Sequence, residues 1–343
     1  MSHQFGRLID SARAAIARSG ARSTAFVLAG RTVRLVGAGP DLVDRVAPAF
    51  AHLPQAGEDA PADLTVLLWD VRSTGEPVPD LGDFAGVAGS PVTPTLHGGS
   101  WSFVHHAYEN AMSYLDREQS LGAYVAEDAA TLLPWDRACP LRSLLTRWLA
   151  PQRLLLAHGA AVGSASGAVV LAGPGGSGKS TTSMACFAAG MGYLGDDYTL
   201  FDIDHQAVWS VYGSAKLADD HLARFPGLME PEPAQPSDPA DVKRVGWPVR
   251  DRPSAIVWSA PVRAIIVPVV TRGPACTLTP VPASRALMAI APPTMFQTAG
   301  DQRAAFHLTT DFVRGLPAYR LELGQGMERV PELLGGLLGE GLS

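Results

Sequence analysis

Apolar positions in the first part of the chain follow helical spacing in some stretches and form short runs in others. Apolar residues at helical spacing predict a helix over Asp41–His52, with Asp41 as a candidate N-cap, and an Ala- and Arg-rich stretch predicts another over Leu8–Arg18. Short apolar runs predict strands, the first two of which form a hairpin. The predicted strands are Ala25–Leu28, Thr32–Val36, Leu64–Trp69, Trp101–Val104 and Gly122–Val125. Glycines and prolines between 75 and 99 indicate loops, so the region is predicted to be α+β.

The pattern changes beyond Arg137 to short β-rich runs separated by glycines, and we place a domain boundary there, between domains 1–137 and 138–343. Prolines between Pro226 and Pro261 exclude a long helix or a central strand and predict an irregular surface excursion. Pro268 marks an end, a bulge or an edge of the strand before it. The predicted helices are Leu141–Leu149, Ser180–Ala189, Arg303–Arg314 and Val330–Leu338, and the predicted strands are Ala160–Val162, Ala168–Ala172, Ala264–Val267 and Ala318–Leu323.

Composition narrows the class of protein. Hydrophobic residues are 47% of the 343, which is enough for a sizeable core, and the net charge of −6 argues against bulk binding of nucleic acid. The three cysteines are an odd number without metal-ligand spacing, as expected of reduced thiols. No N-terminal signal core and no apolar run of membrane-spanning length is evident. We therefore expect a cytoplasmic protein with no nucleic-acid or membrane partner.

The strongest chemical signal is the loop from Gly173 to Ser180, which matches G-x-x-x-x-G-K-[ST] at every fixed position. A chance match somewhere in a chain of this length is roughly a 1% event on average residue usage. An apolar run enters the loop and a helical pattern leaves it, which is the arrangement that phosphate binding by backbone N–H groups needs. The predicted nucleotide contacts are Gly173, Pro174, Gly175, Gly176, Ser177, Gly178, Lys179, Ser180 and Thr181.

This loop predicts ATP, or a closely related triphosphate, and Mg²⁺ as cofactors. Lys179 can reach the β- and γ-phosphates, and the hydroxyl of Ser180 can ligate Mg²⁺. The alternative is a merely tight glycine turn.

Two carboxylates follow the helix. A short strand over 193–195 ends in Asp196 and Asp197, which we expect to lie beside the loop's own strand at the carboxyl edge. One carboxylate can hold Mg²⁺ and the other can accept a proton from an attacking hydroxyl, although such a pair is also common in turns and helix caps. His158 precedes the strand pair and is either a structural histidine or one that orients a carboxylate.

His158-Gly159-Ala160, the loop, and Gly195-Asp196-Asp197 in this order and spacing resemble the HPr kinase family. The resemblance implies an α/β P-loop domain of the HPr kinase/phosphoenolpyruvate carboxykinase type, preceded by a smaller α+β domain. It also implies phosphorylation of a serine hydroxyl, with Asp197 as base, Asp196 as the neighbouring acidic position and His158 as the histidine of the family motif. The first region does not resemble the N-terminal domain of bacterial HPr kinase, and a later glycine-rich signature is missing.

A closer similarity, over nearly the whole chain, is to the HPr-kinase-like group found with lasso-peptide and other ribosomal-peptide gene clusters. It includes the hairpin Ala25–Val36 and the segments Gly195–Tyr198, Tyr212–Leu217 and Leu316–Gly324. The resemblance implies that the partner is a precursor peptide or another protein that carries an acceptor serine. The first domain would then recognise this acceptor, since the second already accounts for the nucleotide.

Other functions stay open at this point. The chain can instead be an ATP-hydrolysing regulator in which Asp197 positions water, a nucleotide-dependent peptide-binding module, an HPr kinase proper, or a small-molecule kinase or carboxykinase. Homo-oligomerisation is also left open. Further basic residues are candidates for phosphate contacts or ordinary surface charges: Lys216, Lys243, Arg244, Arg250, Arg252 and Arg263.

Overall fold

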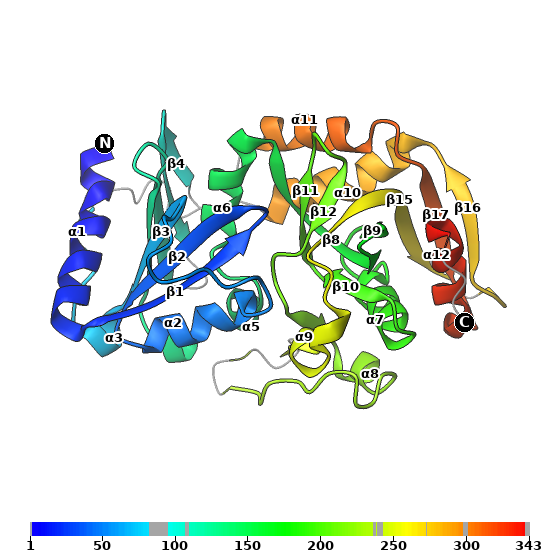
Figure 1. Ribbon diagram of the computed structural model, residues 1–343, viewed down its shortest axis with the longest axis horizontal. Coiled ribbons are helices and arrows are strands. Elements are labelled where there is room, and N and C mark those ends of the chain that lie inside the picture. The colour runs from blue at the N-terminus through cyan, green and yellow to red at the C-terminus, as the bar shows by residue number, and fades with distance from the viewer. Residues whose placement is uncertain are drawn as a thin grey trace. The chain divides into compact units, whose positions relative to one another are not determined.

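The computed structural model describes residues 2–81, 95–106, 110–235, 238, 243–271, 273–297 and 301–339 (Figure 1). The contacts divide the chain into two compact units, Met1–Trp148 with Pro236–Asp238, and Leu149–Gln235 with Pro239–Ser343. The sequence-based boundary lies at Arg137 instead. Residues 142–149 follow that boundary in sequence, but Leu144 packs on the sheet of the first unit. Its Cδ1 lies so close to Gly122 of that sheet that a Cβ added there would be only 2.7 Å away. Part of the predicted loop region, 82–94, lies outside the described residues.

The first unit is built on a seven-stranded sheet in the order β1-β2-β3-β7-β6-β5-β4. The pairs β2–β3 and β3–β7 are parallel and the others are antiparallel. Its strands are β1 (Ala21–Leu28), β2 (Arg31–Ala38), β3 (Leu64–Asp70), β4 (Thr95–Gly98), β5 (Trp101–His106), β6 (Ala111–Asp116) and β7 (Leu121–Ala126). The predicted hairpin is confirmed as β1–β2, with Ala29 and Gly30 in its turn at positive φ.

Successive residues of these strands point to opposite faces of the sheet, and helices pack on both faces. Helix α1 (Ser2–Ser19) packs Leu8 and neighbouring apolar residues against Trp69 on one face. Helix α2 (Asp41–Val46) and α6 (Arg142–Leu149) lie on the other face, where glycines of β2 and β7 admit Val43 and Leu144. The sheet core is therefore two-sided, as the short apolar runs require.

The prediction for Asp41–His52 needs correction. The α-helix ends at Val46 and continues as a 3-10 turn, η1 (Ala47–Phe50), since Pro48 has no N–H for an α-helical hydrogen bond. The N-cap is Pro40 rather than Asp41, and no side chain caps this end.

The second unit is built on an eight-stranded sheet in the order β10-β8-β11-β12-β15-β17-β16, with β9 paired to both β8 and β15. Strand β15 is parallel to both β9 and β17, which are its neighbours, whereas β8 is antiparallel to β9, β10 and β11. The strands are β8 (Leu154–Ser164), β9 (Gly167–Ala172), β10 (Gly192–Gly195), β11 (Tyr198–Asp202), β12 (Ala207–Trp209), β15 (Ser259–Val270), β16 (Thr277–Val281) and β17 (Ala318–Leu323), and a separate pair joins β13 (Ala215–Leu217) to β14 (Arg244–Gly246).

Helices cover both faces of this second sheet (Figure 1). Helices α7 (Lys179–Ala188) and α12 (Val330–Leu338) pack on the face that carries Val162 and Leu171. Helices α10 (Ala283–Gln297) and α11 (Gln302–Val313) pack on the face that carries Ala161 and Val170. The shorter helices are α3 (Val71–Thr74), η2 (Ala129–Thr131), α5 (Pro134–Ala138), η3 (Ala150–Gln152), α8 (Asp219–Leu222), α9 (Pro248–Asp251), η4 (Pro253–Ala255) and η5 (Met327–Arg329). Both units are therefore of mixed α/β architecture.

Several elements of the second unit are longer than predicted or were not predicted. Strand β8 begins at Leu154 rather than Ala160, and β15 begins at Ser259 and continues through Pro268. Strand β9 ends its pairing opposite Ile266, so Pro268 has a described neighbour, β17, on one side only and its missing N–H is tolerated. Helix α10 was not predicted and contains two internal prolines, so packing against the sheet has to hold it.

The cysteines and the lengths of the helices bear on two of the expectations from composition. All three cysteines are free and buried, in line with the absence of metal-ligand spacing. None of the helices in the described ranges combines the length and apolar character that crossing a membrane requires.

The contact between Phe201 of β11 and Phe312 of α11 provides a test of this packing. Their rings stack with centroids 4.1 Å apart, and both side chains are fully buried. We expect Phe312→Ala to lower the free energy of unfolding by about 3–5 kcal/mol, because it leaves a cavity under α11. Urea denaturation followed by circular dichroism measures this loss. Phe306→Ala on the same helix, where the ring is 41% exposed, is the matched control and should change stability by less than about 0.5 kcal/mol. Equal losses in the two variants would contradict the assignment.

Candidate functional site

The glycine-rich loop connects β9 to α7, so the predicted strand, loop and helix follow one another in the structure. Gly176 and Gly178 have φ of +79° and +102°, in the left-handed region that favours glycine. A Cβ on Gly178 would also lie 2.3 Å from Cδ1 of Leu323 in β17. The loop can therefore follow this path only because glycine occupies position 178.

Lys179, the first residue of α7, is turned back onto the loop. Its Nζ donates hydrogen bonds to the carbonyl oxygens of Gly173, at 2.7 Å, and Pro174, at 3.1 Å. The side chain is buried, and burial lowers the pKa of Lys179 while the negative charges of Asp196 and Asp197 oppose that shift. The ammonium group is thus held at the loop with both carboxylates close enough to act on it.

The first turn of α7 supplies further polar groups. The first N–H groups of an α-helix have no partner within the helix, so this end carries a partial positive charge that favours anions. Ser180 and Thr181 follow Lys179 on this turn, and Oγ1 of Thr181 lies 3.0 Å from Nδ1 of His221. The arrangement of loop and helix end is suited to an anionic group.

The two carboxylates lie at an interruption between β10 and β11. Both strands run antiparallel along β8, with Gly195 opposite Ala161 and Tyr198 opposite His158. Asp197 has a φ of +52°, and its carbonyl oxygen accepts a hydrogen bond from the N–H of Gly159 at 2.9 Å. This corrects the expectation of a strand directly beside the loop's strand, because β8 separates β10 from β9. Both are antiparallel to β8, so their carboxyl ends still meet at one edge of the sheet.

Asp196 is buried, with 3% of its surface exposed, and it lies near Ser180. The backbone N–H of Lys216 donates to its Oδ2 at 3.3 Å, whereas its Oδ1 has no hydrogen-bond partner among the described residues. Burial, and after it the charge of Asp197, raise the pKa of Asp196 to about 6, although the hydrogen bond from Lys216 and the nearby hydroxyl of Ser180 act to lower it. A buried carboxylate with an unused oxygen is a site that a cation would stabilise.

Asp197 has the opposite electrostatic environment. It forms an ion pair with Nζ of Lys216, and Nε2 of His158 lies 3.8 Å from its Oδ1. Burial acts to raise the pKa of Asp197, but the positive charge of Lys216, and that of His158 when it is protonated, outweigh burial and hold the pKa below its usual range. Asp197 therefore stays ionised, and Lys216 is a site residue rather than a solvated surface lysine.

These groups surround one cavity of about 510 Å³. Basic side chains from four parts of the chain reach it, namely Lys179, Lys216, Arg224 and Lys243, and Asp197 is the carboxylate among its lining residues. An excess of basic groups in a confined site favours a multiply charged anion. The remaining lining residues include His158, Gly175, Gly176, Gly178, Ser180, Thr181, Leu217, Ala218, His221, Val270, Thr271, Leu323, Gly324 and Met327.

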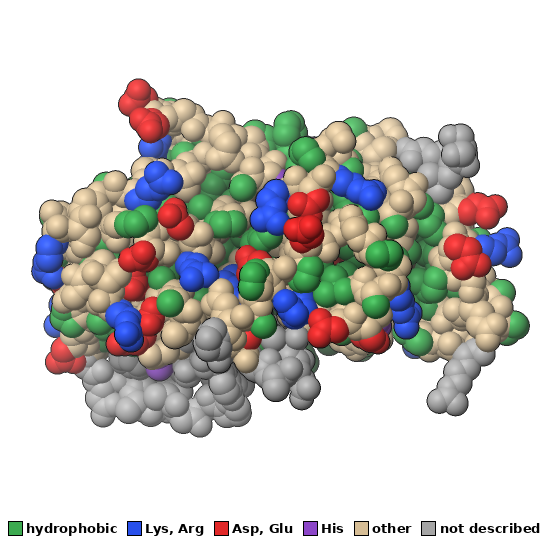
Figure 2. Space-filling model, turned by 90° about the horizontal axis from the view of Figure 1, so that it is seen from below, with side chains coloured by type: hydrophobic (Ala, Val, Ile, Leu, Met, Phe, Trp, Pro, Cys, Tyr) green, Lys and Arg blue, Asp and Glu red, His purple; other side chains and the backbone are tan. Residues whose placement is uncertain are grey.

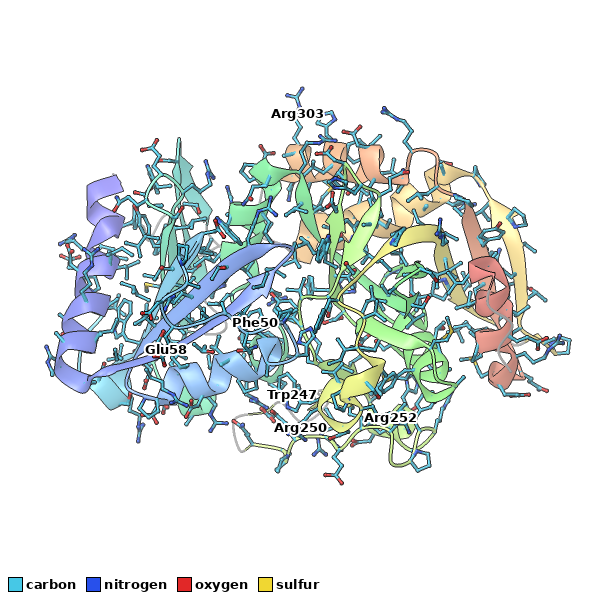
Figure 3. The ribbon with its side chains drawn as sticks, in the orientation of Figure 1. Phe50, Glu58, Trp247, Arg250, Arg252 and Arg303 are labelled. Atoms are coloured by element: carbon cyan, nitrogen blue, oxygen red, sulfur yellow. The ribbon has the colours of Figure 1, made fainter. Side chains whose placement is uncertain are left out.

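Not every predicted basic residue reaches this cavity. Arg250 and Arg252 lie on and just beyond α9 (Figure 3). The guanidinium of Arg252 lies over the ring of Phe187, 5.6 Å from its centroid. Arg244 donates to the carbonyl oxygen of Glu232, and Arg263 to that of Ser166, so both have local structural roles. On the face seen in Figure 2, basic and acidic side chains are interspersed.

The sequence analysis missed His221 and Arg224. Both belong to α8 and the turn after it, where no motif marks them and where only the fold brings them to the loop. Their position in the segment that follows Lys216 is the one signal that connects them to the site.

The donors present fit a Mg²⁺ ion. Mg²⁺ is bound in proteins by one or two oxygen ligands and completes its shell with water and substrate phosphates. The hydroxyl of Ser180 and the unpartnered Oδ1 of Asp196 supply such oxygens at one place. Within the described ranges, no cluster of three or more His, Cys, Asp or Glu residues forms a metal site made of protein ligands alone.

Comparison with known proteins gives little further information. No family model matches the chain, and no curated protein does. Among solved structures, the HPr(Ser) kinase/phosphatase from Coxiella burnetii aligns with 53% of this chain and 92% of its own, at 11% sequence identity and a TM-score of 0.26. A TM-score of this size does not establish a shared fold.

The need for glycine at position 178 can be tested through stability. We expect Gly178→Ala to lower the free energy of unfolding by about 1–3 kcal/mol, because alanine is strained at this φ and its methyl group meets Leu323. Gly175→Ala is the matched control, since a Cβ there has no neighbour within 4 Å and φ is not positive. Chemical denaturation without nucleotide measures both. A loss of the same size at Gly175 would show that the loop is sensitive in general.

The pKa of Asp196 predicts a pH-dependent stability. The folded carboxyl holds its proton up to about pH 6, against an ordinary pKa of 3.8, so its ionisation destabilises the fold as pH rises from about 4 to about 6. The difference corresponds to about 3 kcal/mol. In EDTA, Asp196→Asn should therefore be more stable than the parent at pH 8, and the gain should shrink towards pH 5. Urea denaturation at both pH values measures it, with the exposed Asp220→Asn as control. A gain that does not change with pH would refute the burial argument.

Proposed function

We propose that the chain is an ATP-dependent kinase that transfers a phosphoryl group to a serine hydroxyl of a peptide or protein. The observation that carries this proposal is the shared cavity, in which the loop at Gly173–Ser180 and the carboxylate of Asp197 meet under four basic side chains. A phosphoryl-transfer site needs those parts: a phosphate cradle, positive charge for the transferring group and a base for the acceptor.

In the proposed complex the β- and γ-phosphates lie on the loop and on the first turn of α7. Lys179 exchanges its hydrogen bonds to the loop carbonyls for the phosphate oxygens, as its position at the loop allows. Ser180 and Asp196 hold Mg²⁺, which when bound offsets negative charge on these phosphates. The raised pKa of Asp196 agrees with a carboxyl group whose charge is matched only when a cation is present.

Asp197 is the proposed base. The serine oxygen attacks the γ-phosphorus, its proton passes to Asp197, and the bond from the γ-phosphorus to the bridging oxygen breaks so that ADP leaves. The lowered pKa keeps Asp197 ionised before the reaction. Lys216 and His158 hold the carboxylate in place, in agreement with the supporting role suggested for His158.

The finer features of the proposal come from the resemblance in sequence. It suggests a P-loop domain of the HPr kinase/phosphoenolpyruvate carboxykinase type and a ribosomally made precursor peptide as acceptor. An ATP-hydrolysing role uses the same groups, with water in place of the hydroxyl, so the experiment has to separate the two.

The test is intact-mass analysis of serine-containing precursor peptides incubated with the protein, ATP and Mg²⁺. We expect a gain of one phosphoryl group on serine. Lys179→Ala should abolish the gain, and Asp197→Asn should lower the transfer rate by about 10²–10⁴-fold, as expected for loss of a base, with nucleotide affinity changed far less. Arg250→Ala, an exposed cation outside the cavity, is the matched control and should transfer normally.

Two results would overturn the proposal. Full transfer by Asp197→Asn would remove Asp197 from the role of base. Consumption of ATP by the parent protein without any phosphorylated peptide would favour the hydrolytic role.

A further inference from the structure

Strand β1 has an open edge in its first half. It is the terminal strand of the seven-stranded sheet and pairs with β2 on its other side. The odd-numbered residues turn their backbone groups outward, since Ala25 and Val27 bond to the segment 54–56 on that side. Within the described residues, no backbone group bonds to Ser23 on this side, and the side chain of Ser23 is exposed. An unpaired strand edge is a template for another extended chain.

The chain itself shows that this edge accepts a strand. The N–H of Val27 donates to the carbonyl oxygen of Pro54 at 2.8 Å, and the N–H of Ala56 donates to that of Ala25 at 2.9 Å. Phe26 and Gln55 form an antiparallel bridge between these bonds. The segment 54–56 thus covers the second half of β1, and the edge from Ala21 to the N–H of Ala25 continues beyond it.

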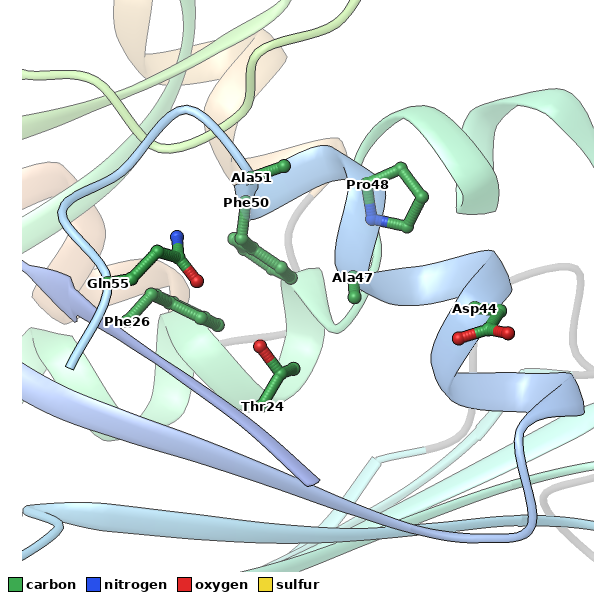
Figure 4. Close-up of a pocket in the computed structure, with 8 residues that line it drawn as sticks. All are labelled: Thr24, Phe26, Asp44, Ala47, Pro48, Phe50, Ala51 and Gln55. Atoms are coloured by element: carbon green, nitrogen blue, oxygen red, sulfur yellow. The ribbon is translucent and has the colours of Figure 1, made fainter. Parts of the chain in front are cut away.

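A pocket of about 340 Å³ adjoins this open edge (Figure 4). Phe26 of β1 and Phe50 of η1 stack with ring centroids 4.5 Å apart, and the two rings face one another in the pocket. Ala47, Pro48 and Ala51 add apolar surface. Asp44, the charged residue among those that line the pocket, has its carboxylate 3.7 Å from Nε of Arg22, which offsets its negative charge. The site therefore selects by apolar fit.

We propose that the open edge of β1 and this pocket bind an extended segment of the acceptor polypeptide. This segment is separate from the one that carries the acceptor serine. The segment adds as a strand beside Ser23 and places one apolar side chain, branched or aromatic, on the face that carries Thr24 and Phe26. Backbone hydrogen bonds supply affinity and the pocket supplies selectivity, as in other cases of strand addition. This inference rests on the proposed function for the identity of the ligand.

The size of the surface favours such a segment over a second copy of the chain. A stable dimer buries about 800 Å² on each partner, from about 20–30 residues. The open edge spans Ala21 to Ala25 before the segment 54–56 closes it, and eight residues line the pocket. That is the area one short strand covers.

Binding of peptides from a displayed library of random linear sequences tests this, with the full-length protein and without nucleotide. Ser23→Pro removes the outward N–H, and proline is tolerated at the outward positions of edge strands. Ser23→Ala keeps the N–H and is its matched control. Ala51→Trp fills the pocket from an exposed position, with Ala51→Ser as its control. Thermal unfolding checks that all four variants fold.

We expect library peptides with a large apolar residue to bind the parent and both controls alike. Their Kd should rise roughly tenfold or more in Ser23→Pro, as for loss of a buried hydrogen bond, and also in Ala51→Trp. Amide hydrogen exchange at Ser23 and Ala25 should slow when peptide binds. Lys179→Ala should bind the peptides as the parent does, because peptide binding at the edge does not need the loop. Absence of phosphoryl transfer by the parent, with peptide binding intact, would therefore overturn the proposed function alone.

Three outcomes would overturn this inference. Peptides that bind folded Ser23→Pro and Ala51→Trp as tightly as the parent would place the binding surface elsewhere. Failure of the parent to enrich any peptide over Ser23→Pro would show that the edge binds none. A dimer in solution that Ser23→Pro converts to monomers would show that a second copy covers the edge.

Discussion

The antiparallel pairing of β8 with β9 on one side and with β10 and β11 on the other is the constraint on which the site depends. Because β8 reverses direction relative to both neighbours, the end of β9 and the end of β10 meet at the same edge. The loop and the carboxylates are separated in sequence by the whole of α7, and this pairing brings them to one cavity. His158 belongs to the same strand, so one element positions three of the groups that the sequence analysis selected.

Within that frame, two neighbouring aspartates acquire different protonation behaviour from their surroundings. Asp196 is enclosed with one oxygen unused, so its pKa is raised, while Asp197 is paired with Lys216 and its pKa is lowered. Two carboxyl groups whose pKa values are shifted in opposite directions are suited to separate tasks, one to holding a cation and the other to accepting a proton. The ion pair with Lys216 also makes Asp197 a weaker base. When the acceptor and the phosphates bind in the cavity, they have to draw Lys216 away from Asp197 to offset this effect.

Local patterns predicted the parts of the molecule that depend on neighbouring residues alone. The loop, α7, the β1–β2 hairpin and α12 follow from glycines, helical spacing and short apolar runs. The pairing of strands that are distant in sequence produces no local sequence pattern, so the position of β8 between β9 and β10 was not predicted. Helix α10 contains prolines that disfavour a helix, and its packing against the sheet and against α11 supports it. Arg224 and His221 line the cavity because of tertiary packing as well, since no motif marks α8 or the turn after it.

The backbone of Asp197 has a consequence for how stability and chemistry share this position. A non-glycine residue in the left-handed region costs of order 1 kcal/mol, although aspartate and asparagine adopt this conformation more readily than most other side chains. The conformation turns the carbonyl group of Asp197 towards Gly159 and its carboxylate towards the cavity. An aspartate kept at such a position marks a place where the fold gives up stability for a charge held in a defined direction.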